Sequence, residues 1–106
     1  MSYNSTSSPL TVGSITIDAE RFTVSVAGEP IMLTLTEFGI LHALASVDGR
    51  VLTRHQLIKQ AIGDDAVVTG RIIDVHITSL RGKLDTARDL IKTVRGIGYR
   101  IAVNDR

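Results

Sequence analysis

The chain has 106 residues, of which 43% are hydrophobic and 22% charged, so it has the length and composition of one compact soluble domain. It contains no cysteine, which excludes disulfides and thiolate metal sites, and its net charge is only +1. It has neither an apolar run of the roughly 18 residues that a membrane span requires nor a signal peptide in MSYNSTSSPL, so we expect a cytoplasmic protein without membrane contact.

The N-terminal third contains a polar segment followed by short β-prone segments. Residues 1–9 are rich in Ser, Thr and Asn and end in Pro9, which is typical of a disordered tail or the remnant of a linker. We therefore place a single domain at residues 10–106. Its β-prone segments are Leu10–Val12, Ile15–Asp18, Phe22–Val26 and Ile31–Leu33. They predict a four-stranded antiparallel meander.

Two helix starts follow, each marked by a capping box in which a threonine and a Glu or Gln three residues later cap each other's backbone N–H. Thr34 and Glu37 form the first box, and apolar residues then recur every three to four residues as far as Asp48-Gly49. Thr53 and Gln56 form the second box and open a shorter helix.

The third predicted helix is the longest, from about Thr69 or Gly70 to Leu84 or a little beyond. Its apolar stripe, which predicts the buried side, comprises Ile73, Ile77, Leu80 and Leu84. The opposite face comprises Arg71, Val75, Thr78, Ser79 and Gly82.

Two strands complete the chain. The segments Ile91–Val94 and Tyr99–Val103 flank Arg95-Gly96-Ile97-Gly98, a glycine-rich tip that predicts a β-hairpin. The element order ββββ-α-α-α-ββ predicts an α+β fold.

The charges are unevenly distributed along the chain. Residues 1–70 hold four Lys and Arg against seven Asp and Glu, whereas residues 71–106 hold eight against four. A basic C-terminal third indicates one positive face, which is typical of a nucleic-acid binder. The alternative is a solvated basic surface.

The polar face of the third helix has the character needed to read the major groove of DNA. Val75 lies in the middle of this face, where a valine can contact a thymine methyl group, and Thr78 and Ser79 can hydrogen-bond bases or phosphates. Gly82 costs roughly 1 kcal/mol of helix stability relative to alanine, but it allows a close approach to DNA. The alternatives are a stray exposed valine and a fraying helix end.

Basic residues of the third helix and the hairpin are candidate phosphate contacts, namely Arg71, Arg81, Lys83, Arg95 and Arg100. Arg81 has an alternative role, because it can pair within the helix with Asp74 or Asp85. We expect Asp74 to orient Arg71 or Arg81. The predicted contacts also include Thr93 and Gly96 of the hairpin and His76, which borders the apolar stripe.

No pattern in the chain predicts catalysis. His42, His55 and His76 lie on different predicted helices without metal-ligand spacing, and no hydrolase, phosphate-loop or dinucleotide motif occurs. We therefore predict that the chain is not an enzyme and holds no metal or cofactor.

Several segments, in order and at matching spacing over about residues 10–103, resemble the C-terminal effector domain of OmpR/PhoB-type response regulators. They are Leu35-Thr36-Glu37-Phe38 with Leu41, Val51-Leu52-Thr53-Arg54-His55-Gln56-Leu57, Arg71-Ile72-Ile73-Asp74-Val75-His76-Ile77, Leu80-Arg81 with Lys83-Leu84, and Thr93-Val94-Arg95-Gly96-Ile97-Gly98-Tyr99-Arg100.

The resemblance implies a winged helix-turn-helix protein that regulates transcription by binding specific double-stranded DNA. It implies a recognition helix near residues 70–85 in the major groove and a wing near residues 94–99 on the adjacent minor groove. Members commonly bind direct-repeat sites as head-to-tail pairs, and in some of them the loop that corresponds to residues 62–69 contacts RNA polymerase.

The chain departs from the family pattern in three respects. Ile62 stands where many members have an aromatic residue, and Thr78, Ser79 and Gly82 stand where members often have basic residues. We therefore expect a readout that depends less on arginine. The receiver domain is absent, so the chain is either an excised effector domain or is regulated in another way. The alternative function is a winged-helix module that binds a protein, with an incidental basic face.

Overall fold

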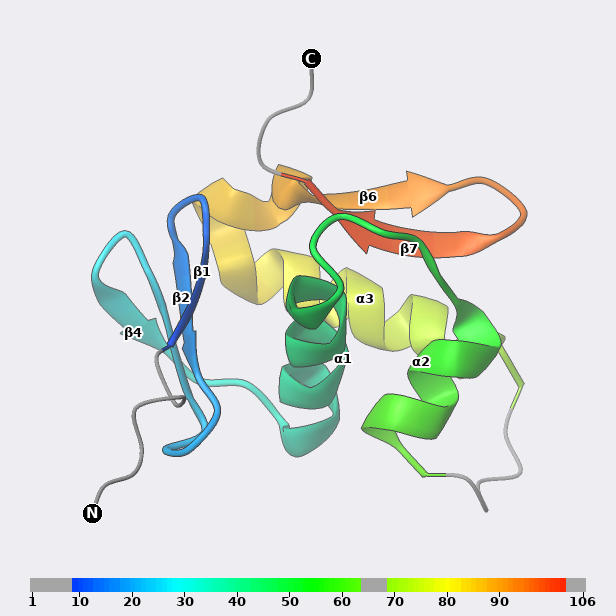
Figure 1. The fold of residues 1–106 in the computed structure, drawn as a ribbon, viewed down its shortest axis with the longest axis horizontal. Coiled ribbons are helices and arrows are strands. Elements are labelled where there is room, and N and C mark those ends of the chain that lie inside the picture. Colours follow the sequence, from blue (N-terminus) through cyan, green and yellow to red (C-terminus); the bar gives the residue numbers. More distant parts are fainter. Residues whose placement is uncertain (1–8, 64–68, 103–106) are drawn as a thin grey trace.

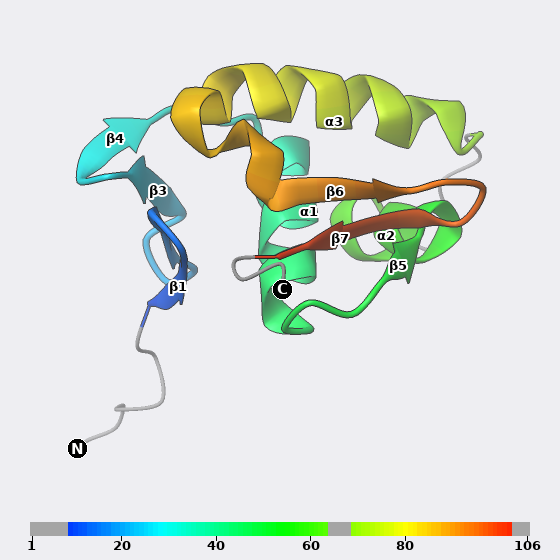
Figure 2. The same ribbon diagram turned by 90° about the horizontal axis from the view of Figure 1, so that it is seen from above.

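The computed structural model describes residues 9–63 and 69–102. Most of the predicted tail, and residues 64–68 of the predicted polymerase-contacting loop, therefore lie outside the described residues. A four-stranded sheet stands at one end of the domain, three helices fill the middle, and a β-hairpin lies beside the third helix (Figures 1 and 2). This arrangement confirms the predicted α+β fold with an N-terminal sheet and a C-terminal wing.

The N-terminal sheet is the predicted meander, with strands β1 (Leu10–Val12), β2 (Ile15–Asp18), β3 (Thr23–Val26) and β4 (Glu29–Ile31) in that order. Strand β4 begins two residues earlier than predicted, because Glu29 pairs with Val26 across a two-residue turn. Both turn residues, Ala27 and Gly28, have positive φ angles of 51° and 83°. Such a turn matches the right-handed twist of a hairpin.

The two predicted capping boxes are present. Helix α1 (Leu35–Ser46) begins at Thr34, whose Oγ1 accepts from the Glu37 N–H at 3.1 Å while the Thr34 N–H donates to Glu37 Oε1 at 2.9 Å. Helix α2 (Arg54–Ala61) begins in the same way at Thr53 with Gln56. Helix α3 (Arg71–Leu84) follows Gly70 and has no side-chain cap.

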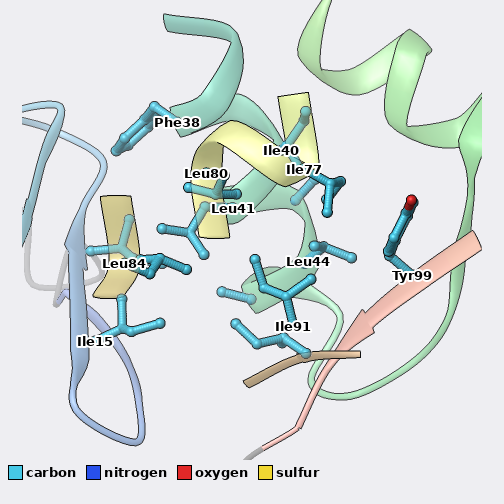
Figure 3. Packing of buried hydrophobic residues seen from close by; sticks show 14 of the residues in the cluster. Ile15, Phe38, Ile40, Leu41, Leu44, Ile77, Leu80, Leu84, Ile91 and Tyr99 are labelled. Atoms are coloured by element: carbon cyan, nitrogen blue, oxygen red, sulfur yellow. The ribbon is translucent and has the colours of Figure 1, made fainter. Parts of the chain in front are cut away.

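The core lies between the N-terminal sheet, α1, α3 and the hairpin (Figure 3). The predicted stripe of α3 is fully buried, since Ile73, Ile77, Leu80 and Leu84 are each at most 1% exposed. Ile40, Leu41 and Leu44 of α1 are also fully buried. Because its apolar stripe packs inward, α3 presents its opposite face to solvent.

Two elements were not predicted from the sequence. A 3₁₀ helix, η1 (Asp85–Leu90), follows α3, and a two-residue strand, β5 (Leu52–Thr53), pairs with the hairpin. The hairpin consists of β6 (Ile91–Val94) and β7 (Gly98–Ile101), and the sheet order is β5-β7-β6. The last strand begins one residue earlier than predicted and ends at Ile101, and Val103 of the predicted strand lies outside the described residues.

Gly98 is required by the pairing of β7 with β5. A β-carbon there would lie 2.8 Å from the Cα of Thr53 and still closer to the Leu52 carbonyl oxygen. The close approach that this glycine allows is therefore to the protein's own backbone. Among the described residues, no helix is both long and apolar enough to cross a membrane.

Candidate nucleic-acid interface

The solvent face of α3 and the hairpin loop lie on neighbouring parts of the surface. The hairpin loop and the first turn of α3 lie at the same end of the domain (Figures 1 and 2). Val75 is 59% exposed, as predicted for the middle of this face, and Arg71, Thr78 and Gly82 are exposed around it. A β-carbon at Gly82 would have no neighbour within 4 Å, so packing within the protein does not require glycine there.

A cleft opens beside the first two turns of α3. It has a volume of about 560 Å³ and is lined by Arg54, Gly70, Arg71, Asp74, Val75 and Thr78. The side chain of Arg54 crosses from α2 over Gly70, where a β-carbon would lie 3.0 Å from its Cδ. The cleft thus brings two guanidinium groups, one carboxylate, a hydroxyl and an exposed valine together. Its net charge is positive and it lies next to the N-terminal end of a helix, and both features favour anions.

Asp74 holds Arg54 and not Arg81, so the prediction that it orients Arg81 is wrong. Its Oδ1 accepts from Arg54 Nε at 2.7 Å and from the Tyr99 hydroxyl at 2.6 Å. Both hydrogen bonds, with that from Tyr99 the stronger influence, lower the pKa of Asp74 against the opposing effect of burial. With Arg71, Asp74 has an electrostatic interaction that also helps to lower the pKa of its carboxylate. Burial and the Asp74 carboxylate raise the pKa of Tyr99, so its hydroxyl stays protonated as a donor at neutral pH.

Arg81 bridges α3 and the hairpin, so the alternative of an ion pair with Asp74 or Asp85 is also wrong. Its Nη2 donates to the Ile91 carbonyl oxygen at 2.8 Å and to Thr93 Oγ1 at 3.0 Å. Its guanidinium carbon also lies 5.7 Å from the centroid of the Tyr99 ring. These contacts attach the helix to both strands of the hairpin.

Glu37 binds two of the side chains that were predicted to contact DNA. This carboxylate is 2% exposed, and it accepts from Ser79 Oγ at 2.6 Å and from Lys83 Nζ at 2.7 Å. Burial alone raises the pKa of Glu37, but the hydrogen bonds from Lys83, Ser79 and the Thr34 N–H lower it to about 2. The side chains of Ser79 and Lys83 are therefore engaged within the protein.

The hairpin loop exposes a basic and an apolar side chain. Arg95, Gly96 and Ile97 connect the two strands, Gly96 has a φ of 77°, and Ile97 is 51% exposed. Thr93 is exposed on β6, whereas Arg100 on β7 and His76 on α3 are half-buried. The described residues contain no group of three potential metal ligands.

Sequence reasoning missed the part played by Arg54 and Tyr99. Arg54 stands between a capping threonine and its glutamine partner, and Tyr99 stands in a β-strand pattern. The local pattern accounts for each residue, so neither was predicted to be part of the binding site. Only the packing of α2 and β7 against α3 brings them to Asp74. A pairing of Arg54 with Asp74, 20 residues away, has no periodic signal in the sequence.

Residues 28–101 match the family of transcriptional regulatory protein C-terminal domains. The chain belongs to this family. This confirms the resemblance to OmpR/PhoB-type response regulators, a family of transcription regulators rather than a class of enzymes.

Relatives and solved structures agree with this assignment. The sensory transduction protein RegX3 of Mycolicibacterium smegmatis is 46% identical over 95 residues, which cover 87% of this chain and 42% of RegX3. The chain thus spans less than half the length of this relative. The DNA-binding domain of Klebsiella pneumoniae RstA, solved in complex with the RstA box, has a TM-score of 0.79 and 35% identity, covering 91% of this chain and 98% of that domain. The DNA-binding domain of the response regulator AdeR, solved in complex with an intercistronic region, has a TM-score of 0.78 and 30% identity, covering 89% of this chain and 99% of that one.

Proposed function

We propose that this domain binds specific sequences of double-stranded DNA, with α3 in the major groove and the hairpin loop on the adjacent minor groove. The main support is the surface at the N-terminal half of α3, where the exposed Val75 lines the cleft together with two arginines. The start of α3 lies at the same end of the domain as the hairpin loop (Figure 2). An exposed helix face of this width fits the major groove of B-DNA. The complexes of RstA and AdeR domains with DNA support the same role.

Each proposed contact has a role that follows from its chemistry. Arg71 and Arg54 bind phosphates, and Arg54 enters the contact already oriented by Asp74 and Tyr99. Val75 contacts a thymine methyl group, and Thr78 contacts a base or phosphate beside it. The remaining proposed contacts, which serve mainly the DNA backbone and the minor groove, are His76, Gly82, Arg95, Gly96 and Arg100. Thr93 is not among them, because its hydroxyl already accepts a hydrogen bond from Arg81.

The structure gives Ser79 and Lys83 less support as DNA contacts than the sequence did. Each reaches DNA only by leaving the buried Glu37 carboxylate, which costs the hydrogen bonds that hold α3 against α1. We therefore propose that both side chains hold α3 against α1 and do not contact DNA.

The assembly and the partners follow the family pattern. We propose that the domain acts in the bacterial cytoplasm as part of a response regulator, and that two copies bind direct-repeat sites head to tail. Contact with RNA polymerase through residues 62–69 belongs to the same proposal.

Selection from random duplex DNA tests the function directly. Enrichment of one motif, bound far more tightly than a scrambled duplex, is the expected result, and the spacing of its repeats tests the head-to-tail pair. The logarithm of the binding constant for the scrambled duplex should fall linearly with the logarithm of salt concentration. Equal and weak binding to every duplex would overturn the proposal. The exposed Val75 and Ile97 would then indicate a protein-binding module.

A further inference from the structure

We propose that Arg81 positions the hairpin for DNA and does not itself bind a phosphate. This inference rests on the proposed function, because it gives Arg81 of the recognition helix a role in positioning the hairpin loop for contact with DNA. The residue type and the position on α3 alone would favour a phosphate contact.

The hydrogen-bonding partners of Arg81 lie within the protein. The two hydrogen bonds from Nη2, to the Ile91 carbonyl oxygen at 2.8 Å and to Thr93 Oγ1 at 3.0 Å, both reach β6. The guanidinium also approaches the Tyr99 ring of β7, with 5.7 Å between its central carbon and the ring centroid. One planar group thus meets both strands of the hairpin, as its fixed fork of donors allows.

A second attachment joins the same hairpin to α3, nearer the start of the helix. The Tyr99 hydroxyl donates to Asp74 at 2.6 Å, and Arg54 lies over the Tyr99 ring at 5.4 Å. Figure 3 shows the Tyr99 side chain extending from β7 toward α2. Arg81 and Asp74 are seven residues apart on α3, so they fix two points of the hairpin along the helix.

The loop that carries Arg95 lies beyond both attachments, at residues 95–97. Its position relative to α3 is therefore set by these two points and by the strand pairing with β5. If the Arg81 attachment is removed, the loop samples more orientations, and its contact with DNA costs more conformational entropy. The effect of Arg81 on binding is therefore exerted through Arg95.

A double-mutant cycle between Arg81 and Arg95 tests this dependence. In the otherwise unchanged protein, Arg95→Ala removes one phosphate contact, which lowers the binding constant about tenfold at 0.1 M salt and makes the log–log salt slope shallower by about 0.9. Arg81→Met removes the guanidinium but keeps an unbranched side chain suited to a helix. We expect it to produce a loss of similar size.

The decisive result is the double variant. If Arg81 acts through the loop, the double variant Arg81→Met with Arg95→Ala binds DNA within about twofold of Arg81→Met alone. Its log–log salt slope is then shallower than that of the unchanged protein by about 0.9, the value for one phosphate contact. If Arg81 binds its own phosphate, the losses multiply to about a hundredfold and the slope becomes shallower by about 1.8. That result, or unchanged binding by Arg81→Met, would overturn the proposal.

Two further variants keep the interpretation clear. Arg88→Met removes the same charge from η1, where the exposed Arg88 side chain makes no hydrogen bond or ion pair with the described residues, and is expected to leave the salt slope unchanged. Thr93→Val removes one acceptor of Arg81 while keeping a β-branched residue in β6. It should weaken binding about threefold to fivefold and show the same lack of additivity with Arg95→Ala, even if Arg81→Met fails to fold. If the protein without substitutions shows no specific binding, that result refutes the proposed function instead.

Discussion

The two halves of α3 carry similar polar residues but use them differently. In the N-terminal half, Arg71, Val75 and Thr78 face solvent around an open cleft, although Asp74 among them is bound to Arg54 and Tyr99. In the C-terminal half, Ser79 and Lys83 are bound to Glu37 of α1, and Arg81 is bound to the hairpin. The comparison shows that a polar helix face is available for recognition only where no other element of the fold supplies partners for it.

The largest effect that separates the two halves should be a dependence of folding stability on pH. The pKa of Glu37 is about 2 in the folded protein, below its ordinary value of 4.5, so its contribution to stability is complete above pH 4.5. That contribution, about 3 kcal/mol, is lost as the pH falls from 4.5 through 2. Urea unfolding at a series of pH values measures it. A free energy of unfolding that stays constant over this interval would contradict the role of Glu37.

Glu37→Gln should give the next largest effect. Glutamine can still accept from the Thr34 N–H as a capping residue, but it cannot neutralise Lys83. Breaking a fully buried ion pair costs about 3–5 kcal/mol, and we expect about 2 kcal/mol because Lys83 is 39% exposed. Glu29→Gln on the exposed strand β4 is the matched control and should change the free energy of unfolding by less than about 0.5 kcal/mol. Equal effects of the two variants would remove the distinction between the halves.

Val75→Ala should have a smaller effect, and on DNA only. The variant loses two methyl groups from a side chain that is 59% exposed, so its free energy of unfolding should change by less than about 0.5 kcal/mol. Specific affinity should fall by about 1 kcal/mol, roughly fivefold, with scrambled DNA unaffected. Replacing the contacted thymine by uracil, which lacks the methyl group, should weaken the unchanged protein but not the variant. Equal losses on specific and scrambled DNA would rule out the methyl contact.

The sequence predicted the elements whose signals are local. Both capping boxes and the buried stripe of α3 depend on residues three or four apart, and the structure contains all of them. Strand β5 has only two residues and is defined by its pairing with β7. This pairing requires a residue without a side chain at Gly98. No local period indicates such a strand.

The candidate site was predictable to a similar degree. The exposure of Val75 follows from helical periodicity, since it lies opposite a stripe that must be buried. The partners of Ser79, Arg54 and Arg81 lie 42, 20 and between 10 and 12 residues away, on other elements. Periodicity identifies the exposed face of a helix, but only the tertiary structure shows which exposed polar groups are already bound.

The most direct test compares Arg71→Ala with Lys83→Met for the salt dependence of DNA binding and for stability. We expect Arg71→Ala to make the log–log salt slope shallower by about 0.9 and to change the free energy of unfolding by less than about 0.5 kcal/mol. We expect the reverse for Lys83→Met: its salt slope is unchanged and its free energy of unfolding falls by about 1–2 kcal/mol, because the buried Glu37 loses its ion-pair partner. A shallower slope for Lys83→Met with unchanged stability would contradict the division of α3 into a half that binds DNA and a half that holds the fold.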